Sequence, residues 1–460
     1  MRENGNLQLP LAPVWGQHDR SKELEQISIL LDAHPHLSKL ATADLRGNRS
    51  ANRGRKGMSG EQILRIGLLY MTYELTYEEL TFHLGDSSAF RAFARLPLDR
   101  TPKVSTLKNN LKRVRPETWE AVNLALVKTA ELEGVEKGRM TRTDCTVVET
   151  NIHHPTDSDL LWDCVRVITR ILKRLAKQFP HEPWDFHDRT RRAKKRAHEI
   201  AYPPRKLGMK KREQREQLYR DLIMVTEEVY EYGIDALAKL KLVTPSGILD
   251  AAFVASTEAE LREFLASTQK VIEQSYRRVI EGKSVPNEDK IVSIFETHTD
   301  IIIKKNREVL FGHKVCLTGG KSSMILDAVV EEGNPADSTM VERSIQRVDN
   351  IYGRPPRQAS FDGGFASKDN LRLAKQAGVE DVMFHKKCGL EVEDMAKSPW
   401  VFRKLRKFRA GIEACISTLK RAFGMRRASW RGEQGFRSYV WASIASFNAV
   451  ILARRLISAT

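Results

Sequence analysis

The sequence predicts a mixed α/β protein with an all-helical region near its N-terminus and a second, strongly basic helical region in its middle. Three observations support this fold class. Capping motifs and apolar residues at helical spacing fill residues 57–135, and helical spacing returns over residues 158–285. Alternating and β-branched runs follow from about residue 290 and are succeeded by strand–helix alternation. Such a pattern is typical of a mixed sheet flanked by helices.

Length and composition indicate a folded protein with a polyanionic partner. The 460 residues suffice for two or three domains, and an apolar content of 41% argues against wholesale disorder. The formal net charge of +17 favours nucleic acid as the partner, although charge also serves solubility. The five cysteines include no Cys-x-x-Cys pair, so neither a zinc ribbon nor a disulfide framework is indicated, and their odd number fits a reducing compartment.

We expect a cytoplasmic protein with no membrane segment. The first 17 residues lack the apolar core of a signal peptide. Residues 439–456 form the most apolar stretch, but Ser, Asn and Arg interrupt it, so it is not expected to span a bilayer.

The N-terminal part is predicted to consist of helices. Residues 1–56 hold one helix, which Ser21 can cap, followed by a basic linker. The motifs Ser59-x-x-Gln62 and Thr76-x-x-Glu79 are capping boxes, and each opens a helix. A third short helix is expected over residues 88–96.

A further helix over residues 104–114 is a candidate DNA reader. Its apolar positions recur at helical spacing, and its remaining surface is basic or amide-bearing. The outward-facing residues are Lys108, Asn109, Lys112 and Arg113. Short helices with such a surface suit a helix-turn-helix reader of duplex DNA. On this region alone, a plain helical bundle with a solvated face fits equally well.

The middle of the chain holds the densest block of charge. Between Arg189 and Arg220 there are thirteen Lys or Arg residues and three Glu residues. A solvated basic face is the common explanation of such a run. We favour a segment that lies along a phosphate backbone. The residues of this block that we expect to bind DNA are Arg191, Arg192, Lys194 and Lys195.

The C-terminal part is predicted to alternate between strands and helices. Strands are expected over residues 290–295, 312–318 and 324–330. The Gly-Gly-Lys-Ser run at 319–322 lacks the earlier glycine of a phosphate-binding loop and indicates a hairpin turn. The remaining elements are a helix over 336–352, a strand that ends at Asp362, a helix over 367–378, a strand over 379–384, and helices over 408–424 and 436–456.

Three acids stand in distinctive local contexts. Asp144 interrupts an apolar strand, Asp362 ends a strand just before two glycines, and Glu413 lies in a helix. Two strand-borne aspartates and a helix-borne glutamate suit a pair of divalent metal ions in phosphoryl transfer, because hard cations prefer oxygen ligands. Arg409 precedes Glu413 by one helical turn and Lys420 follows it by two. Taken singly, each acid also fits a structural role, such as a surface ion pair or a turn.

Several long, co-linear segments carry a family resemblance. They include TDCTVVETNIHHPTDSDLLWD, SFDGGFASKDNLRLAKQAGVEDVMFHKK and FRAGIEACISTLKRAFG. In these segments the chain resembles DDE-type insertion-sequence transposases of the ISNCY-type group, nearly end to end. Related transposases carry a Tyr-(2)-Arg-(3)-Glu-(6)-Lys signature, which Arg409, Glu413 and Lys420 match, whereas Arg406 replaces the tyrosine.

The resemblance implies an RNase H-like catalytic core with Asp144, Asp362 and Glu413 as its metal-binding catalytic triad. Two Mg²⁺ ions, or Mn²⁺, are the implied cofactors, and Arg409 and Lys420 are expected to contact DNA phosphates. The implied partner is double-stranded DNA, both element ends and target. Because two ends must be joined, the DNA-bound protein is expected to be a homo-oligomer.

The expected organisation has four parts. Residues 1–56 form a helical arm and linker, and residues 57–135 a helix-turn-helix-like domain that recognises terminal inverted repeats. Residues 136–157 and 286–460 form the RNase H-like catalytic domain, which the basic helical insertion of residues 158–285 interrupts. The expected activity is metal-dependent strand cleavage and transfer. Two alternatives are a catalytically silent, transposase-derived DNA-binding protein or repressor, and an RNase H-like nuclease without strand transfer.

Overall fold

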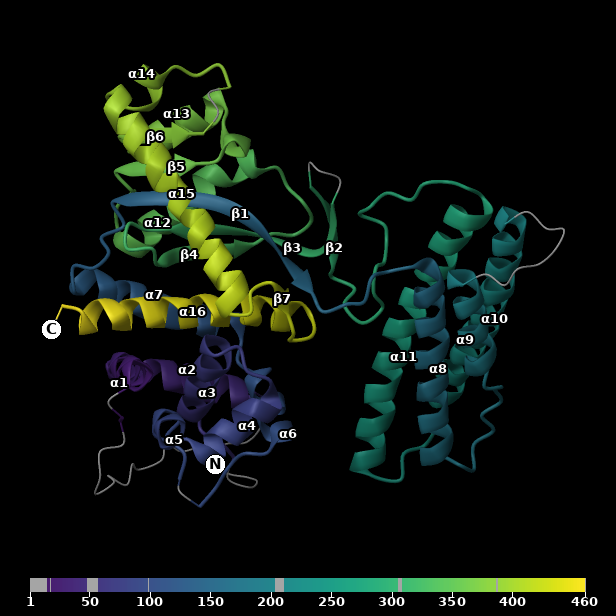
Figure 1. The fold of residues 1–460 in the computed structure, drawn as a ribbon. Coiled ribbons are helices and arrows are strands. Elements are labelled where there is room, and N and C mark those ends of the chain that lie inside the picture. Colours follow the sequence, from purple (N-terminus) through teal and green to yellow (C-terminus); the bar gives the residue numbers. More distant parts are fainter. Residues whose placement is uncertain are drawn as a thin grey trace. The chain divides into compact units, whose positions relative to one another are not determined.

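The computed structural model describes residues 15–16, 18–47, 57–97, 99–202, 211–304, 308–385 and 388–459. The fold divides into two compact units (Figure 1). The first unites Met1–Asn151 with Gly312–Thr460, and the second comprises Ile152–Phe311. The predicted mixed α/β class is confirmed by a mixed sheet and sixteen α-helices among the described residues.

The central strand of the sheet is β1 (Met140–Thr150), in the order β2-β3-β1-β5-β6. It pairs antiparallel with β3 and parallel with β5 and β7, while β4 pairs antiparallel with β3 and β6 parallel with β5. The other strands are β2 (Asp300–Ile303), β3 (Val309–Gly319), β4 (Ile325–Val330), β5 (Gln358–Phe361), β6 (Asp381–Phe384) and β7 (Arg427–Ala428).

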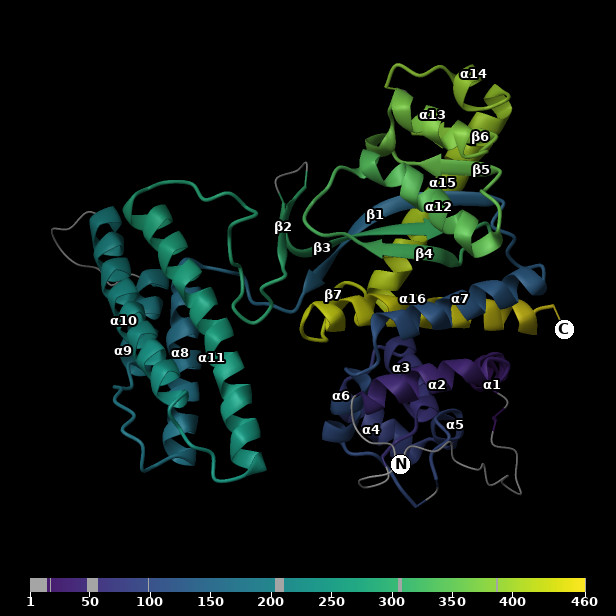
Figure 2. The same cartoon turned by 180° about the vertical axis from the view of Figure 1, so that it is seen from behind.

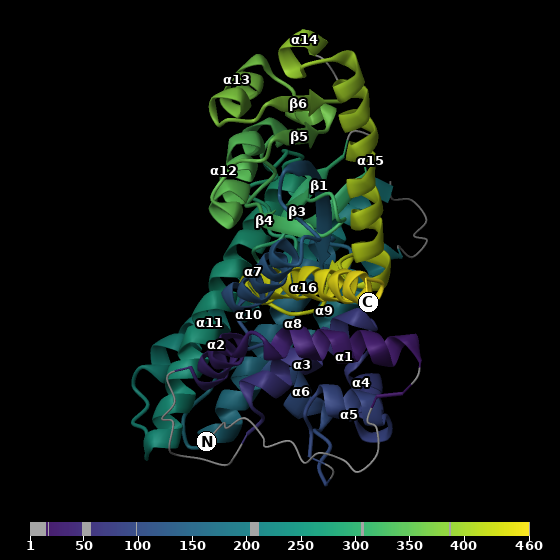
Figure 3. The same ribbon diagram turned by 90° about the vertical axis from the view of Figure 1, so that its left-hand side faces the viewer.

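Helices cover both faces of the sheet in the first unit (Figure 3). On one side lie α12 (Val341–Tyr352) and α13 (Lys368–Gln376), and on the other α15 (Pro399–Ala422) packs on β1, β5 and β6. The short elements η2 (Asp337–Met340), η3 (Gly363–Phe365) and α14 (Val392–Met395) connect them.

Seven described helices form the N-terminal region, and three of them, α1, α3 and α7, pack against the last helix of the chain, α16 (Glu433–Ile457), which runs beside α7 (Figure 2). The seven helices are α1 (Asp19–Asp32), α2 (Pro35–Arg46), α3 (Gly60–Thr72), α4 (Tyr77–Asp86), α5 (Ser88–Phe93), α6 (Val104–Leu111) and α7 (Pro116–Leu132). Among the described helices, α16 alone is long and apolar enough to cross a membrane. Its most apolar window is 72% buried within the protein, which favours a core helix.

Two buried asparagines join α16, α7 and β4. Asn448 accepts from the Ile325 amide at 2.9 Å and donates to the Ile325 carbonyl and to Asn123 Oδ1, each at 2.6 Å. Both side chains are buried, so these hydrogen bonds satisfy groups that water cannot reach. The pair thereby fixes the last helix of the chain to the sheet.

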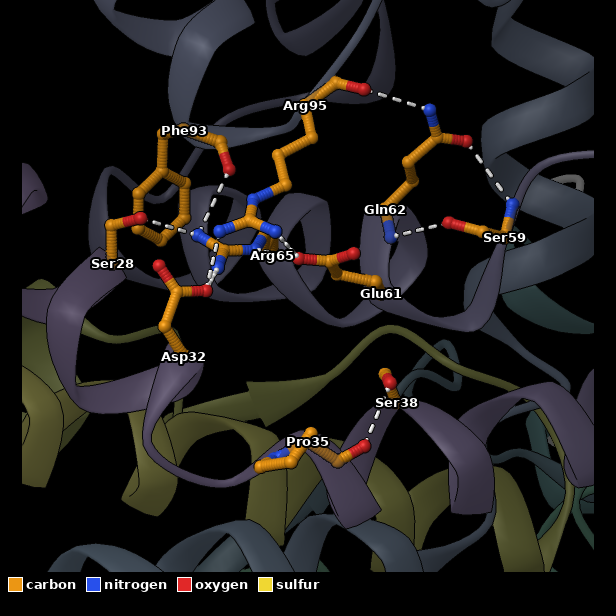
Figure 4. Close-up of polar contacts among 10 residues, drawn as sticks. All are labelled: Ser28, Asp32, Pro35, Ser38, Ser59, Glu61, Gln62, Arg65, Phe93 and Arg95. Atoms are coloured by element: carbon orange, nitrogen blue, oxygen red, sulfur yellow. Dashed lines mark hydrogen bonds and ion pairs between the residues drawn. The ribbon is translucent and has the colours of Figure 1, made fainter. Parts of the chain in front are cut away.

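A buried arginine ties the first helices together (Figure 4). Arg65 on α3 is 1% exposed and donates to Ser28 Oγ at 2.8 Å and to Asp32 Oδ1 at 2.7 Å, both on α1. Arg95 pairs with Asp32 and, at 2.6 Å, with Glu61. Two carboxylates thus compensate two guanidinium groups, as a buried charge requires.

Helix α15 docks on β1 through a second buried arginine. Arg142 donates to the Phe408 carbonyl at 3.0 Å and to Ser323 Oγ at 3.1 Å, and its guanidinium lies 4.7 Å from the centre of the Phe408 ring. It also packs on Gly411, where an added Cβ would lie 1.7 Å from Arg142 Nη1. Only glycine therefore lets the helix approach the strand this closely.

The second unit is a helical bundle with a core of its own. It consists of α8 (Asp157–Gln178), α9 (Thr190–Ala201), α10 (Lys211–Leu240) and α11 (Ile248–Ser275), which ends in the π-helical turn η1 (Tyr276–Ile280). The helical character predicted for residues 158–285 is confirmed over most of the described residues of this range.

Several element predictions are confirmed. Both capping boxes form, at Ser59 and at Thr76, and a hairpin joins β3 to β4. The short helix predicted near residue 88 and the helix predicted from residue 104 are also present. The linker predicted after α2 lies largely outside the described residues.

Other element predictions are wrong. The described residues among the first 56 hold two helices rather than one, and His18, not Ser21, caps the first, because its side chain accepts from the Arg20 amide. Residues 290–295 form no strand. The Gln274 side chain binds the amide and the carbonyl of Ile291, at 2.9 and 3.1 Å, so this backbone pairs with a helix side chain. Helix α15 begins at Pro399, well before residue 408.

Replacing Asn448 with Leu should lower the free energy of unfolding by about 2–3 kcal/mol, because a buried polar group that loses its partner costs about 1–3 kcal/mol. Urea denaturation measures this change. Asn350→Leu, on the exposed surface of α12, is the matched control and should stay within about 0.5 kcal/mol of the parent. Equal stability of the two variants would contradict the role of Asn448.

Gly411→Ala should destabilise the protein by about 1–3 kcal/mol, the usual penalty for overpacking a filled site. The clash is with Arg142, so the penalty should shrink when Arg142 is replaced by Met. A double-mutant cycle in denaturant measures the coupling, which is expected to be on the order of 1 kcal/mol. Additive effects of the two substitutions would mean that the glycine is needed for another reason.

Candidate active site

The two aspartates lie next to each other because their strands are parallel neighbours. The pairing of β1 with β5 ends at Thr143 and Phe361; Asp144 is the next residue of β1, and Asp362 is the first residue after β5. Asp362 also precedes the turn η3, so its side chain lies where the strand has ended. Ends of strands are the usual place for ligands in α/β sheets.

The third acid, Glu413, lies on α15, and Arg409 of the same helix links it to the two aspartates. The Nη1 atom of Arg409 lies 3.4 Å from Asp362 Oδ1 and 3.8 Å from Asp144 Oδ2. Its Nη2 atom donates to Glu413 Oε1 at 2.9 Å. One guanidinium group therefore contacts all three predicted acids.

Exposure differs strongly within this group. The side chains of Arg409 and Asp144 are 10% and 19% exposed, whereas those of Asp362 and Glu413 are 43% and 60% exposed. Burial, together with the neighbouring Asp362 and Glu413, raises the pKa of Asp144 to about 6, although the Cys145 amide and Arg409 act in the opposite direction. The site thus holds more negative charge than one arginine neutralises.

The donor set suits a hard divalent cation, since it consists of carboxylate oxygens. Within the described part of the chain, however, no three Asp, Glu, His or Cys side chains form a group that could hold a metal ion. The three acids are instead arranged about the Arg409 guanidinium. Their assignment as metal ligands stays a prediction.

Lys420 lies two turns beyond Glu413 on α15, and its ammonium group donates to the Val147 carbonyl of β1 at 2.8 Å. The side chain is half-buried. This contact anchors the C-terminal half of α15 to the strand that carries Asp144, and it places the lysine on the same side of the sheet as the acids.

The residues predicted to read DNA lie on a different surface of the first unit. Lys108, Asn109 and Arg113 are exposed on or just after α6, and Lys112 is half-buried at its C-terminal cap. Helix α6 packs on α3 and α4, on the far side of α7 and α16 from the sheet (Figures 1 and 2). The structure does not bring these residues to the acids.

The four basic residues predicted on α9 belong to the second unit and are all exposed. They differ in their partners. Arg192 is ion-paired with Asp221, and Lys195 lies 4.0 Å from Glu199. For Arg191 and Lys194, no acidic partner is found among the described residues. Of the four residues, Arg191 and Lys194 therefore have the charges least neutralised by described carboxylates.

Two features of the site were missed by the sequence analysis. Arg142 positions α15, but nothing in the sequence around this strand residue indicates that its side chain contacts a helix. The exposed surface of α15 is basic before and after the acid. Its exposed cations are Arg403, Lys404, Arg406, Lys407 and Arg421. The run FRKLRKFR that holds most of them was visible in the sequence as a charge cluster.

Comparison with protein families gives two matches. Residues 293–449 match the family described as Transposase DDE domain, and residues 16–113 match the Transposase domain (DUF772). The first span includes Asp362, Arg409 and Glu413, whereas Asp144 precedes it. No curated protein sequence and no solved structure matched the chain.

The two matches together cover more than half of the 460 residues, and the mixed sheet with its flanking helices is consistent with the RNase H-like core expected from the sequence. They do not distinguish the ISNCY-type group from other insertion-sequence transposases. The fold, the arrangement of acids and the two family matches identify the chain as an insertion-sequence DDE transposase.

Proposed function

We propose that this transposase cleaves DNA at the ends of its insertion sequence and joins the freed 3′ ends to target DNA. The proposed catalytic residues are Asp144, Asp362 and Glu413. The observation that carries the proposal is the convergence of these acids, from two neighbouring strands and one helix, on a single cation. Acids gathered in this way need positive charge, and phosphoryl transfer uses it.

The three carboxylates would hold two Mg²⁺ ions, or Mn²⁺, and the raised pKa of Asp144 supports an added positive charge there. When bound, such ions lower the pKa of a water molecule and stabilise the charge on the leaving oxygen. Asp144, the most buried acid, lies on β1, which pairs with β5 and also packs against α15, so it is suited to be shared by both ions.

Arg409 and Lys420 are proposed to hold DNA phosphates near the cut. A guanidinium group can pair with a phosphate through two parallel hydrogen bonds, whereas an ammonium group acts as a point charge. Glu413 is 60% exposed on α15, so the backbone of DNA can reach the acids from the solvent side of this helix. The exposed cations before and after Glu413 would then flank the scissile phosphate.

Further DNA contacts are proposed away from the acids. The α6 residues Lys108, Asn109, Lys112 and Arg113 would read terminal inverted repeats from a helix-turn-helix-like domain of residues 57–135. The α9 residues would grip the phosphate backbone from the basic insertion of residues 158–285. If about eight phosphates are neutralised in all, the slope of log K against log salt is near −7.

Joining two element ends requires two active sites to act on one DNA complex. We therefore propose that the DNA-bound protein is a homo-oligomer, and that it acts in the prokaryotic cytoplasm on nucleoid DNA. The buried character of α16 is compatible with this location.

Asp144→Asn should abolish strand cleavage while leaving binding to the element ends nearly unchanged. The amide keeps the size of the side chain but removes the charge that a divalent ion needs. Cleavage and strand transfer are measured on the element's own flanking DNA with Mg²⁺, and binding by electrophoretic mobility shift. Asp369→Asn, an exposed aspartate on α13, is the matched control and should retain activity.

Full cleavage by Asp144→Asn in Mg²⁺ would refute the assigned triad. Cleavage by the parent protein without joining of pre-nicked ends would instead identify a nuclease. A parent protein that binds the ends but never cuts them would be a repressor.

Replacing both Arg191 and Lys194 with Ala should weaken DNA binding and reduce the magnitude of the salt slope by about 2, roughly one unit per lost phosphate contact. Arg192→Ala should change the slope less, because Asp221 already neutralises that arginine. Affinity is measured by fluorescence anisotropy over a series of salt concentrations. Equal slopes for parent and double variant would remove α9 from the DNA interface.

A further inference from the structure

We infer that Arg409 is an internal counter-ion that occupies the acid site in the absence of DNA and must leave before divalent metal binds. Phosphate of the DNA backbone would draw it away. This inference rests on the proposed catalytic role of Asp144, Asp362 and Glu413, and it adds a form of regulation: the metal site is completed only when DNA is present.

The position of Arg409 makes it a direct competitor for the acids. Its Nη1 atom is within 3.8 Å of a carboxylate oxygen of both Asp144 and Asp362, and its Nη2 atom binds Glu413. A metal ion shared by the two aspartates would need the same oxygen atoms. Because guanidinium and metal are both cations, they cannot occupy that space together.

A divalent ion, once available, is expected to compete successfully with Arg409 for the three carboxylates. One guanidinium group balances a single charge among three carboxylates, so the acids stay under-compensated. Arg409 is not fully satisfied either, since its Nε atom is buried without a hydrogen-bond partner in the described structure. A buried N–H group without an acceptor is destabilising, and a hydrogen bond to a new acceptor would remove that penalty.

A DNA phosphate provides that acceptor next to the site. The exposed residues Arg406, Lys407 and Ala410 flank Arg409 on the solvent side of α15, where two cations attract a backbone phosphate and a small side chain leaves room for it. An arginine on a flexible stem can exchange its contacts with the three carboxylates for a bidentate contact with one phosphate. Metal and DNA would therefore promote each other's binding through one residue.

The inference is tested by Mn²⁺ binding to the full-length protein without DNA, followed by electron paramagnetic resonance of the free ion. Arg409→Gln should bind Mn²⁺ at least about tenfold more tightly than the parent, because the competing charge is gone. Arg409→Lys keeps a charge that cannot bridge all three acids, so its affinity should lie between the two. Arg372→Gln, which removes an exposed, ion-paired arginine on α13, is the matched control and should bind like the parent.

The double variant Arg409→Gln with Asp144→Asn separates this inference from the proposed triad. Loss of the added affinity in the double variant places the ion at the acids. If Arg409→Gln and Arg409→Lys both bind Mn²⁺ as the parent does, while Asp144→Asn binds less, the triad stands and the counter-ion role is overturned. If Asp144→Asn does not weaken binding in either background, the triad itself fails. Thermal unfolding with and without Mn²⁺ confirms that each variant is folded and reports the same differences as shifts in melting temperature.

Coupling to DNA gives a second measurement on the same variants. The affinity for a non-specific duplex is compared with and without Mn²⁺, and Mn²⁺ bound by the free duplex contributes equally for each protein. In the parent, Mn²⁺ should tighten duplex binding severalfold, and in Arg409→Gln this gain should largely disappear. An equal gain in both proteins would show that Arg409 does not link the two ligands.

Discussion

The packing of α15 against β1 is the contact on which the active site depends. The helix contributes Arg409 and Glu413, and the strand contributes Asp144, so their separation is set by how closely the two backbones approach. Arg142 and Gly411 fix that approach, because the arginine side chain fills the space that any other residue at 411 would occupy. Lys420 adds a second tether through the Val147 carbonyl, which limits rotation of the helix about the first.

The rest of the first unit keeps this contact in place. Helix α16 packs on α7, α3 and α1, and Asn448 joins it to β4, so the two ends of the chain are held to the same sheet. The second unit is inserted between β1 and most of β3, the two strands at the centre of the sheet. A long insertion between paired strands adds little closure entropy once those strands have formed, because that term grows only with the logarithm of loop length.

The sequence predicted the parts of the structure that local patterns determine. The capping boxes at Ser59 and Thr76, the β3–β4 hairpin and the helical character of the second unit all follow from short-range signals. It failed where a distant group decides. Residues 290–295 have the composition of a strand, yet the Gln274 side chain on α11 forms hydrogen bonds with the backbone of Ile291. The three acids were found from sequence, but the arginine among them was assigned only to DNA, since spacing on a helix shows that Arg409 neighbours Glu413 and not that it reaches two strands.

Charge explains why the site has this composition. Three carboxylates side by side repel one another, and in the folded protein without metal that repulsion would push α15 away from the strands. An arginine inside the group relieves it, and the same arginine is the residue best shaped to bind a phosphate. This double role of Arg409 helps a protein that must not cleave DNA outside the correct complex. The arginine that stabilises the acids before DNA binds is the group that DNA phosphate would draw away. The buried Nε atom of Arg409, which has no hydrogen-bond partner among the described residues, reflects that compromise: the arginine stabilises the folded site without metal but is not fully satisfied there, so a phosphate can draw it away.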